Sequence, residues 1–215
     1  MYKITFNLKS GVSFVERPLF DGILAYCWMK EKYGEVPQKL TINEGEVENF
    51  DRLPLKKHED GYFMASWLMF DESNHVEAVG SWKKRWANEQ DHLTNFQGKK
   101  RKVRINAGEF KSYNMPLVLH NVGKCWFYFD GDAEAVKSLI EKHLWGIGKK
   151  TSQGYGEFST FNIEQVDYNP FEQIIRPIPV KQEELKNKGG ISMRWMGWKP
   201  PYWLPSHQAF CWVSE

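Results

Sequence analysis

The chain has 215 residues, 41% hydrophobic and 26% charged, with a formal net charge of +2, which is typical of a folded domain with its own core rather than a disordered chain. Its three cysteines form no CxxC pair and no cluster with histidine, which disfavours a disulfide scaffold and a structural zinc site. No signal peptide and no apolar run of about 18 residues is present, so the sequence predicts a cytoplasmic protein that contacts no membrane.

The first third of the chain predicts a strand, a helix and a second strand. Residues 2–8 (YKITFNL) alternate between apolar and polar side chains, as a strand requires. Residues 21–34 predict a helix that Asp21 caps and Gly34 ends. Residues 61–70 (GYFMASWLMF) are rich in aromatic side chains and predict a buried strand.

The second half of the chain predicts two strands, a helix and a last strand. Residues 114–120 (NMPLVLH) and 125–129 (CWFYF) predict two strands. Residues 133–144 predict an amphipathic helix that Gly146 ends. Residues 157–166 (EFSTFNIEQV) predict a last strand after a glycine-rich loop.

This order predicts an α+β fold of the ferredoxin-like βαββαβ type in a single domain. The core would span about residues 1–70 and 121–167, interrupted by a basic insertion of about 71–120. A Trp- and Pro-rich C-terminal extension would cover about 168–215. Outside the core, residues 167–190 predict a surface excursion, whereas the tryptophan-rich part from 191 onward predicts a segment that docks on its own domain.

Positive charge is concentrated in the predicted insertion. Between Lys83 and Lys111 the chain has nine basic and three acidic residues, a net charge of +6 that leaves −4 for the rest. Such a concentration favours a polyanion as the ligand, although a charge run by itself is also typical of a solvated surface. The basic residues are Lys83, Lys84, Arg85, Lys99, Lys100, Arg101, Lys102, Arg104 and Lys111.

The loop GIGKKTSQGYGEF (146–158) combines four glycines with two adjacent lysines. Neither a nucleotide P-loop nor a dinucleotide fingerprint fits, because His143 and Thr151 occupy positions where these motifs need glycine. Both motifs also follow a strand and open a helix, whereas this loop follows a predicted helix. The loop therefore indicates another kind of phosphate site.

A glycine-rich loop before the last strand of a ferredoxin-like fold resembles the RAMP superfamily of CRISPR RNA-binding proteins. The signature G-x-G-x-x-x-x-x-G-[FY]-G is matched by Gly146, Gly148, Gly154, Tyr155 and Gly156. Stretches spread over nearly the whole chain are similar to the Cas5-type subunit of type IV effector complexes: 17–27, 61–67, 98–117, 175–180 and 199–203.

The resemblance implies a non-catalytic subunit that grips the 5′ handle of the guide RNA (crRNA) and caps a filament of backbone subunits. Its expected partners are the crRNA and the backbone and large subunits, with target DNA near the protospacer-adjacent motif as a further expectation. Guide pairing would supply sequence specificity. No catalytic residue, metal ligand or cofactor is predicted.

The residues themselves agree with RNA binding. The N–H groups of Gly148, Gly154 and Gly156 could hold phosphates, with Lys149 and Lys150 adding charge. Gln153 and Tyr155 could contact sugar or base edges. The run from Lys99 to Arg104 alternates partly as a strand does and could follow several phosphates. Trp82 and Trp86, which flank the KKR triplet, could stack on bases or pack into a core.

Two other functions stay open at this point. A metal-independent endoribonuclease that processes CRISPR precursor RNA would need an acid–base residue, for which His143 is the best candidate. A histidine at a helix C-terminus also stabilises the helix end, which is the structural interpretation of the same residue. A ferredoxin-like domain that binds a small molecule is the third class, against which the basic insertion argues.

Overall fold

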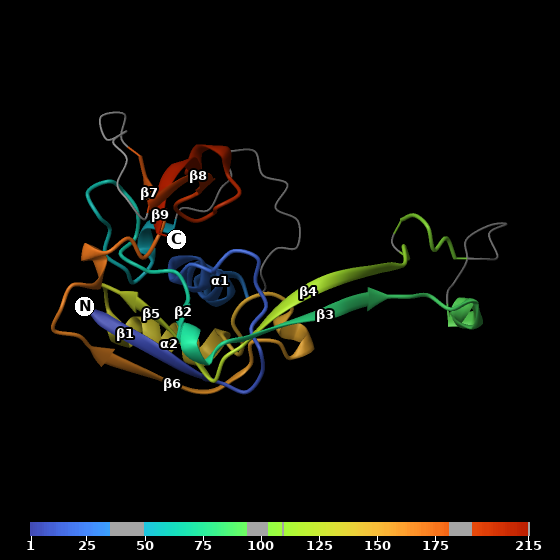
Figure 1. Ribbon diagram of the computed structural model, residues 1–215. Coiled ribbons are helices and arrows are strands. Elements are labelled where there is room, and N and C mark those ends of the chain that lie inside the picture. The colour runs from blue at the N-terminus through green and yellow to red at the C-terminus, as the bar shows by residue number, and fades with distance from the viewer. Residues whose placement is uncertain (35–49, 94–102, 109, 181–190, 215) are drawn as a thin grey trace.

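Strands with alternating apolar residues form the central sheet of the protein (Figure 1). The computed structural model describes residues 1–34, 50–93, 103–108, 110–180 and 191–214. The sheet is antiparallel with strand order β2-β5-β1-β6. Phe6 and Phe127 point to one face and are fully buried, whereas Trp126 faces the other side and is half-buried. The strands are β1 (Tyr2–Leu8), β2 (Met69–Phe70), β5 (Lys124–Phe129) and β6 (Phe158–Gln165).

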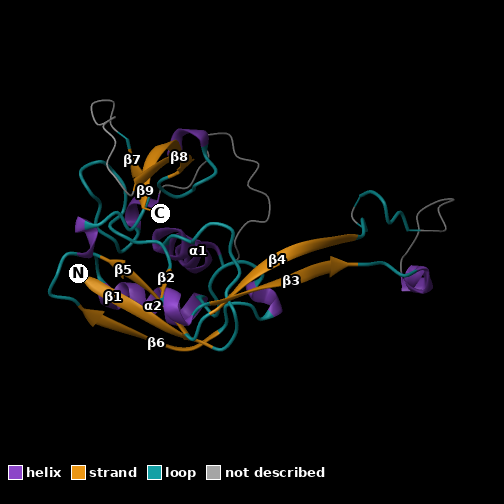
Figure 2. Cartoon of the chain, in the orientation of Figure 1, coloured by secondary structure: helices purple, strands orange, loops and turns teal. Residues whose placement is uncertain are grey.

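Two helices, α1 (Phe20–Tyr33) and α2 (Ala133–His143), cover the buried face of this sheet (Figures 1 and 2). Leu24 of α1 and Ile140 of α2 are fully buried in the shared core. The mixed α/β character is as predicted, and both helices and the strands expected at 2–8, 114–120, 125–129 and 157–166 are confirmed. No helix among the described residues has the length and hydropathy needed to cross a membrane.

The predicted helix ends are only partly correct. Gly34 ends α1, with φ of 75°, but Asp21 does not cap it, because the helix begins one residue earlier and Leu19 is the N-cap. Helix α2 ends with Leu144 as its C-cap, so Gly146 is not the stop. The side chain of Asp132 caps the start of α2 by accepting two backbone N–H groups.

The strand predicted over 61–70 is wrong for most of its length. Only β2 (Met69–Phe70) joins the sheet ladder. Phe63 and Ala65 make isolated bridges with Lys57 and Phe129 respectively. Because the partner changes along the segment, a continuous ladder does not form, although the segment is buried as its aromatic residues predicted.

The C-terminal residues form a separate three-stranded antiparallel sheet with the order β7-β9-β8. Its strands are β7 (Ile178–Pro179), β8 (Ile191–Gly197) and β9 (Gln208–Ser214). The hydroxyl of Tyr202, between β8 and β9, donates a hydrogen bond to Asp21 of α1. This part of the chain therefore docks on its own protein, as predicted.

Arg176 corrects the prediction of a surface excursion at 167–190. Its side chain is 1% exposed, and its guanidinium donates to the carbonyls of Phe63, Ala65 and Trp198 and to the carboxylate of Asp21. Burial raises the pKa of Asp21, and the positive charge of Arg176 opposes this shift. The arginine connects the loop before β2, helix α1 and the C-terminal sheet.

A two-stranded hairpin, here called the arm, projects from the body of the molecule (Figure 1). It consists of β3 (Val76–Lys84) and β4 (Tyr113–Asn121), which pair only with each other among the described strands. At its base, His120 exchanges two backbone hydrogen bonds with Val12, of 2.8 and 3.0 Å. The base is thereby attached to the segment that follows β1.

Candidate nucleic-acid interface

The glycine-rich loop lies between α2 and β6 and rests on the segment that follows β1. The backbone N–H of Lys149 donates to the carbonyl of Ser13 at 2.7 Å, and that of Gly156 donates to the carbonyl of Gly11 at 2.9 Å. The Ser10 hydroxyl donates to the carbonyl of Gly154 at 2.6 Å. These hydrogen bonds fix the conformation of the loop and its position against residues 10–13.

The same hydrogen bonds correct the prediction that the glycine N–H groups hold phosphates. The N–H of Gly154 donates to Thr151 and that of Gly156 to Gly11, so neither can hold a phosphate in this conformation. Among the described residues, none accepts a hydrogen bond from the N–H of Gly148. Of the three glycine N–H groups, only that of Gly148 therefore stays available for a phosphate, and an anion bound here would be held chiefly by side chains.

One of the two loop lysines connects the loop with the arm. The Lys150 Nζ lies 2.9 Å from the centroid of the Trp82 ring on β3. Lys150 itself has a left-handed backbone, with φ of 62°, while its neighbour Lys149 is exposed. Two segments predicted separately from the sequence thus come together at this contact.

The Trp82 face of the arm combines aromatic and basic side chains. Trp82 and Lys84 are two residues apart on β3 and so share one face of the ladder, whereas Lys83 points to the opposite face. Tyr113, the register partner of Lys84, lies on the Trp82 face with its ring 4.6 Å from the Trp82 ring at 57°. We call Trp82, Lys84, Tyr113 and Lys150 the arm–loop platform.

Sequence reasoning missed Tyr113. The available signal was its place next to a basic run at the start of a predicted strand, but its pairing with Lys84 depends on the register of the hairpin. Trp86, by contrast, packs within the arm tip. Its Nε1 donates to Asp91 at 2.6 Å, and its ring meets Phe110 edge-on at 4.9 Å.

The other predicted RNA contacts are placed as follows. Arg85, Arg104 and Lys111 are exposed near the far end of the arm, and Lys99, Lys100, Arg101 and Lys102 lie outside the described residues. Arg104 is not in a strand, so the strand-like alternation predicted up to it is wrong at that end. In the loop, Gln153 is exposed and Tyr155 is half-buried.

His143, the candidate acid–base residue, serves as a link between the two helices. Its Nε2 contacts the carboxylate of Glu31 on α1, to which Lys142 also donates at 2.8 Å. These two partners hold the pKa of Glu31 below its usual value, the Lys142 hydrogen bond acting most strongly. The contact favours the structural interpretation of this histidine.

Comparison with known proteins adds one match. Residues 1–215 match the family described as CRISPR type IV associated protein Csf3. A search of curated proteins found no match. Because the family match spans the full length, it includes the arm and the C-terminal sheet as well as the glycine-rich loop.

Proposed function

The chain belongs to the Csf3 family, Cas5-like subunits of type IV CRISPR effector complexes, and from this premise we propose that it grips the 5′ handle of the guide RNA. Membership confirms the resemblance stated from the sequence, and it makes the chain an effector subunit. The handle contact, the RNA-binding residues and target DNA near the protospacer-adjacent motif are parts of the proposal.

The observation that carries the proposal is the contact between Lys150 and Trp82. It places a loop cation, two aromatic rings and a second lysine on one surface, the arm–loop platform. Single-stranded RNA is commonly bound by such a combination, because bases stack on aromatic rings while lysines neutralise phosphates.

We assign different tasks to the parts of this interface. Trp82 and Tyr113 would stack on handle bases, and Lys149, Lys150 and Lys84 would contact the phosphates between them. The exposed Arg85, Arg104 and Lys111 would extend the positive track toward the arm tip, and the exposed Lys83 would add positive charge on the opposite face of the arm. Base pairing by the guide, rather than these side chains, would select the target sequence.

We also propose that the body is a ferredoxin-like core. Its elements follow in the order β1-α1-β2-β5-α2-β6, and the sheet order β2-β5-β1-β6 supports this assignment. The arm, inserted between β2 and β5, would then be the basic insertion of a single domain, with the C-terminal sheet as its extension. Neighbouring effector subunits are the expected protein partners.

The proposal is tested by the affinity of the purified protein for a labelled CRISPR-repeat RNA, measured without metal across a salt series. Changing Lys149 and Lys150 to Ala should weaken binding and lower the log–log salt dependence by roughly 0.7 for each phosphate that is no longer neutralised. Trp82→Ala should weaken binding with little change in the salt dependence, because stacking is not an ionic contact.

Lys137→Ala is the matched control, since Lys137 is an exposed lysine on α2 outside the platform. Unchanged RNA affinity in the folded double-lysine variant would contradict the assignment. Resolving the labelled RNA on a gel after the binding reaction also reports cleavage, and a single metal-independent cut would favour the endoribonuclease instead.

A further inference from the structure

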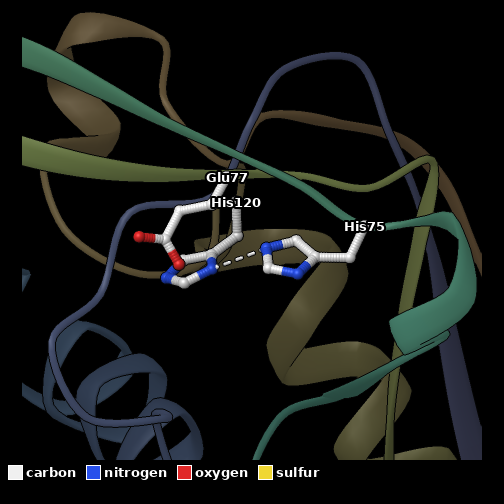
Figure 3. A group of neighbouring side chains, drawn as sticks. All are labelled: His75, Glu77 and His120. Carbon is white, nitrogen blue, oxygen red and sulfur yellow. Dashed lines mark hydrogen bonds between the residues drawn. The ribbon is translucent and has the colours of Figure 1, made fainter.

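Three potential metal ligands, His75, Glu77 and His120, meet at the base of the arm (Figure 3). His75 immediately precedes β3 and has an extended backbone, so its side chain and that of Glu77 point to the same side. Glu77 is the register partner of His120 on β4. Strand geometry therefore places all three side chains on one face of the ladder.

The spacing of these ligands fits one ion. The Nε2 of His75 and the Nδ1 of His120 share a hydrogen bond of 3.0 Å, which an ion between them would replace, and the ligand atoms of all three residues lie within 4.8 Å of one another (Figure 3). Two nitrogens bound to a tetrahedral zinc ion at its usual bond length lie about 3.3 Å apart. Coordination would thus separate the two rings by only a few tenths of an ångström.

Each imidazole ring also has a neighbour outside the group of three ligands. The other ring nitrogen of His75, Nδ1, lies 3.9 Å from the carboxylate of Glu72, which is itself paired with Arg17. This distance is too long for a hydrogen bond, so the carboxylate acts on the ring through its charge alone. The His120 ring stacks on Phe14, with centroids 3.9 Å apart and an angle of 10°.

The three ligands are partly shielded from solvent. The His75 side chain is 17% exposed and its ring lies 5.0 Å from that of Phe70, whereas Glu77 is exposed and leaves a way in from solvent. Arg17, whose positive charge acts on His120, forms an ion pair with Glu72. A cation can therefore approach from the Glu77 side.

We propose that His75, His120 and Glu77 bind one divalent transition-metal ion, with zinc as the ion that this ligand set suits best. The ion fastens β3 to β4 where the arm leaves the body, and its fourth coordination position faces solvent. The two histidines are 45 residues apart in the sequence, so no short spacing motif announces the site.

The test uses the full chain stripped of metal and titrated with Zn²⁺ by calorimetry and with Co²⁺ by absorption spectroscopy. We expect one ion per chain and, for Co²⁺, the visible bands of a tetrahedral site. His75→Gln and Glu77→Gln should each weaken binding by at least about 10–100-fold, because that is already the loss when only a group behind a metal ligand is changed. Because Glu77 is exposed, its variant should keep the wild-type fold, which circular dichroism checks.

His58→Ala and His92→Ala are the matched controls. His58 belongs to a second group of neighbouring ligands with Glu59 and Asp60, and His92 is exposed at the arm tip. Both variants should bind the ion like the wild type. Absence of binding by the wild type, or wild-type affinity in Glu77→Gln and His75→Gln, would overturn the proposal, as would loss of binding in His58→Ala alone.

Discussion

At Gly154 and Gly156, two glycines of the same loop are required for different physical reasons. Gly154 has φ of 87°, but a Cβ atom there would meet nothing within 4 Å. Gly156 has φ of 68°, and a Cβ atom would lie 1.9 Å from the carbonyl oxygen of Ile147. The first position is restricted by backbone conformation alone, and the second also by the close approach of Ile147.

Alanine substitutions should therefore separate the two positions. Gly154→Ala should lower the free energy of unfolding by roughly 1–2 kcal/mol, the cost of a left-handed residue with a side chain. Gly156→Ala should cost more, because the backbone of Ile147 would also have to move. Thermal or urea unfolding measures the difference, with Gly123→Ala as a control at a glycine that has open space and no positive φ. Equal losses at Gly154 and Gly156 would contradict this explanation.

On the scale of elements, a buried arginine links the C-terminal sheet to the body, beside the hydrogen bond from Tyr202 to Asp21. Arg176 and Asp21 are 1% and 0% exposed, and Arg176 donates to carbonyls on both sides of the boundary between the sheet and the body. Removing one member of a buried ion pair leaves the other charge without compensation, which costs more than an exposed pair would.

Arg176→Met should destabilise the protein by about 3–5 kcal/mol and loosen the C-terminal sheet first. Urea unfolding gives the total loss, and hydrogen exchange shows where protection disappears. Arg194→Met is the control, because Arg194 is an exposed arginine of β8. A loss below about 1 kcal/mol, the scale of an exposed ion pair, would show that the pair does not hold the sheet in place.

On the scale of the whole molecule, charge and fold are divided between the arm and the body. The segment from Lys83 to Lys111 has a net charge of +6, while the rest of the chain has −4. Figure 1 shows the arm reaching away from the body, and its strands pair only with each other among those described. RNA affinity and folding stability should therefore be separable.

Joining Ala78 to Leu119 through an Asn-Gly turn tests this separation, because the two residues are register partners and Asn-Gly suits a two-residue hairpin. The shortened protein should keep a cooperative thermal transition, since the contact of His120 with Val12 remains. It should lose most of its RNA affinity and salt dependence. Unfolding, or full RNA affinity, would show that the two properties are not divided in this way.

The local pattern of the sequence determined most of the secondary structure. Alternation predicted β1, the aromatic run CWFYF predicted β5, apolar periodicity predicted both helices, and glycines with adjacent lysines marked the loop before β6. These features depend on neighbours a few residues apart, which the sequence displays directly. The strand at 61–70 was wrong because its bridging partners lie in three different segments of the chain.

Only the tertiary structure decided how distant residues meet. Arg176 was expected at the surface and is instead buried against Asp21, 155 positions away. The contact of Lys150 with Trp82 and the pairing of His75 with His120 likewise depend on where the arm is attached and on its strand register. Such contacts follow from packing and strand register, which bring residues together whatever their separation along the chain. A local sequence pattern therefore could not predict them.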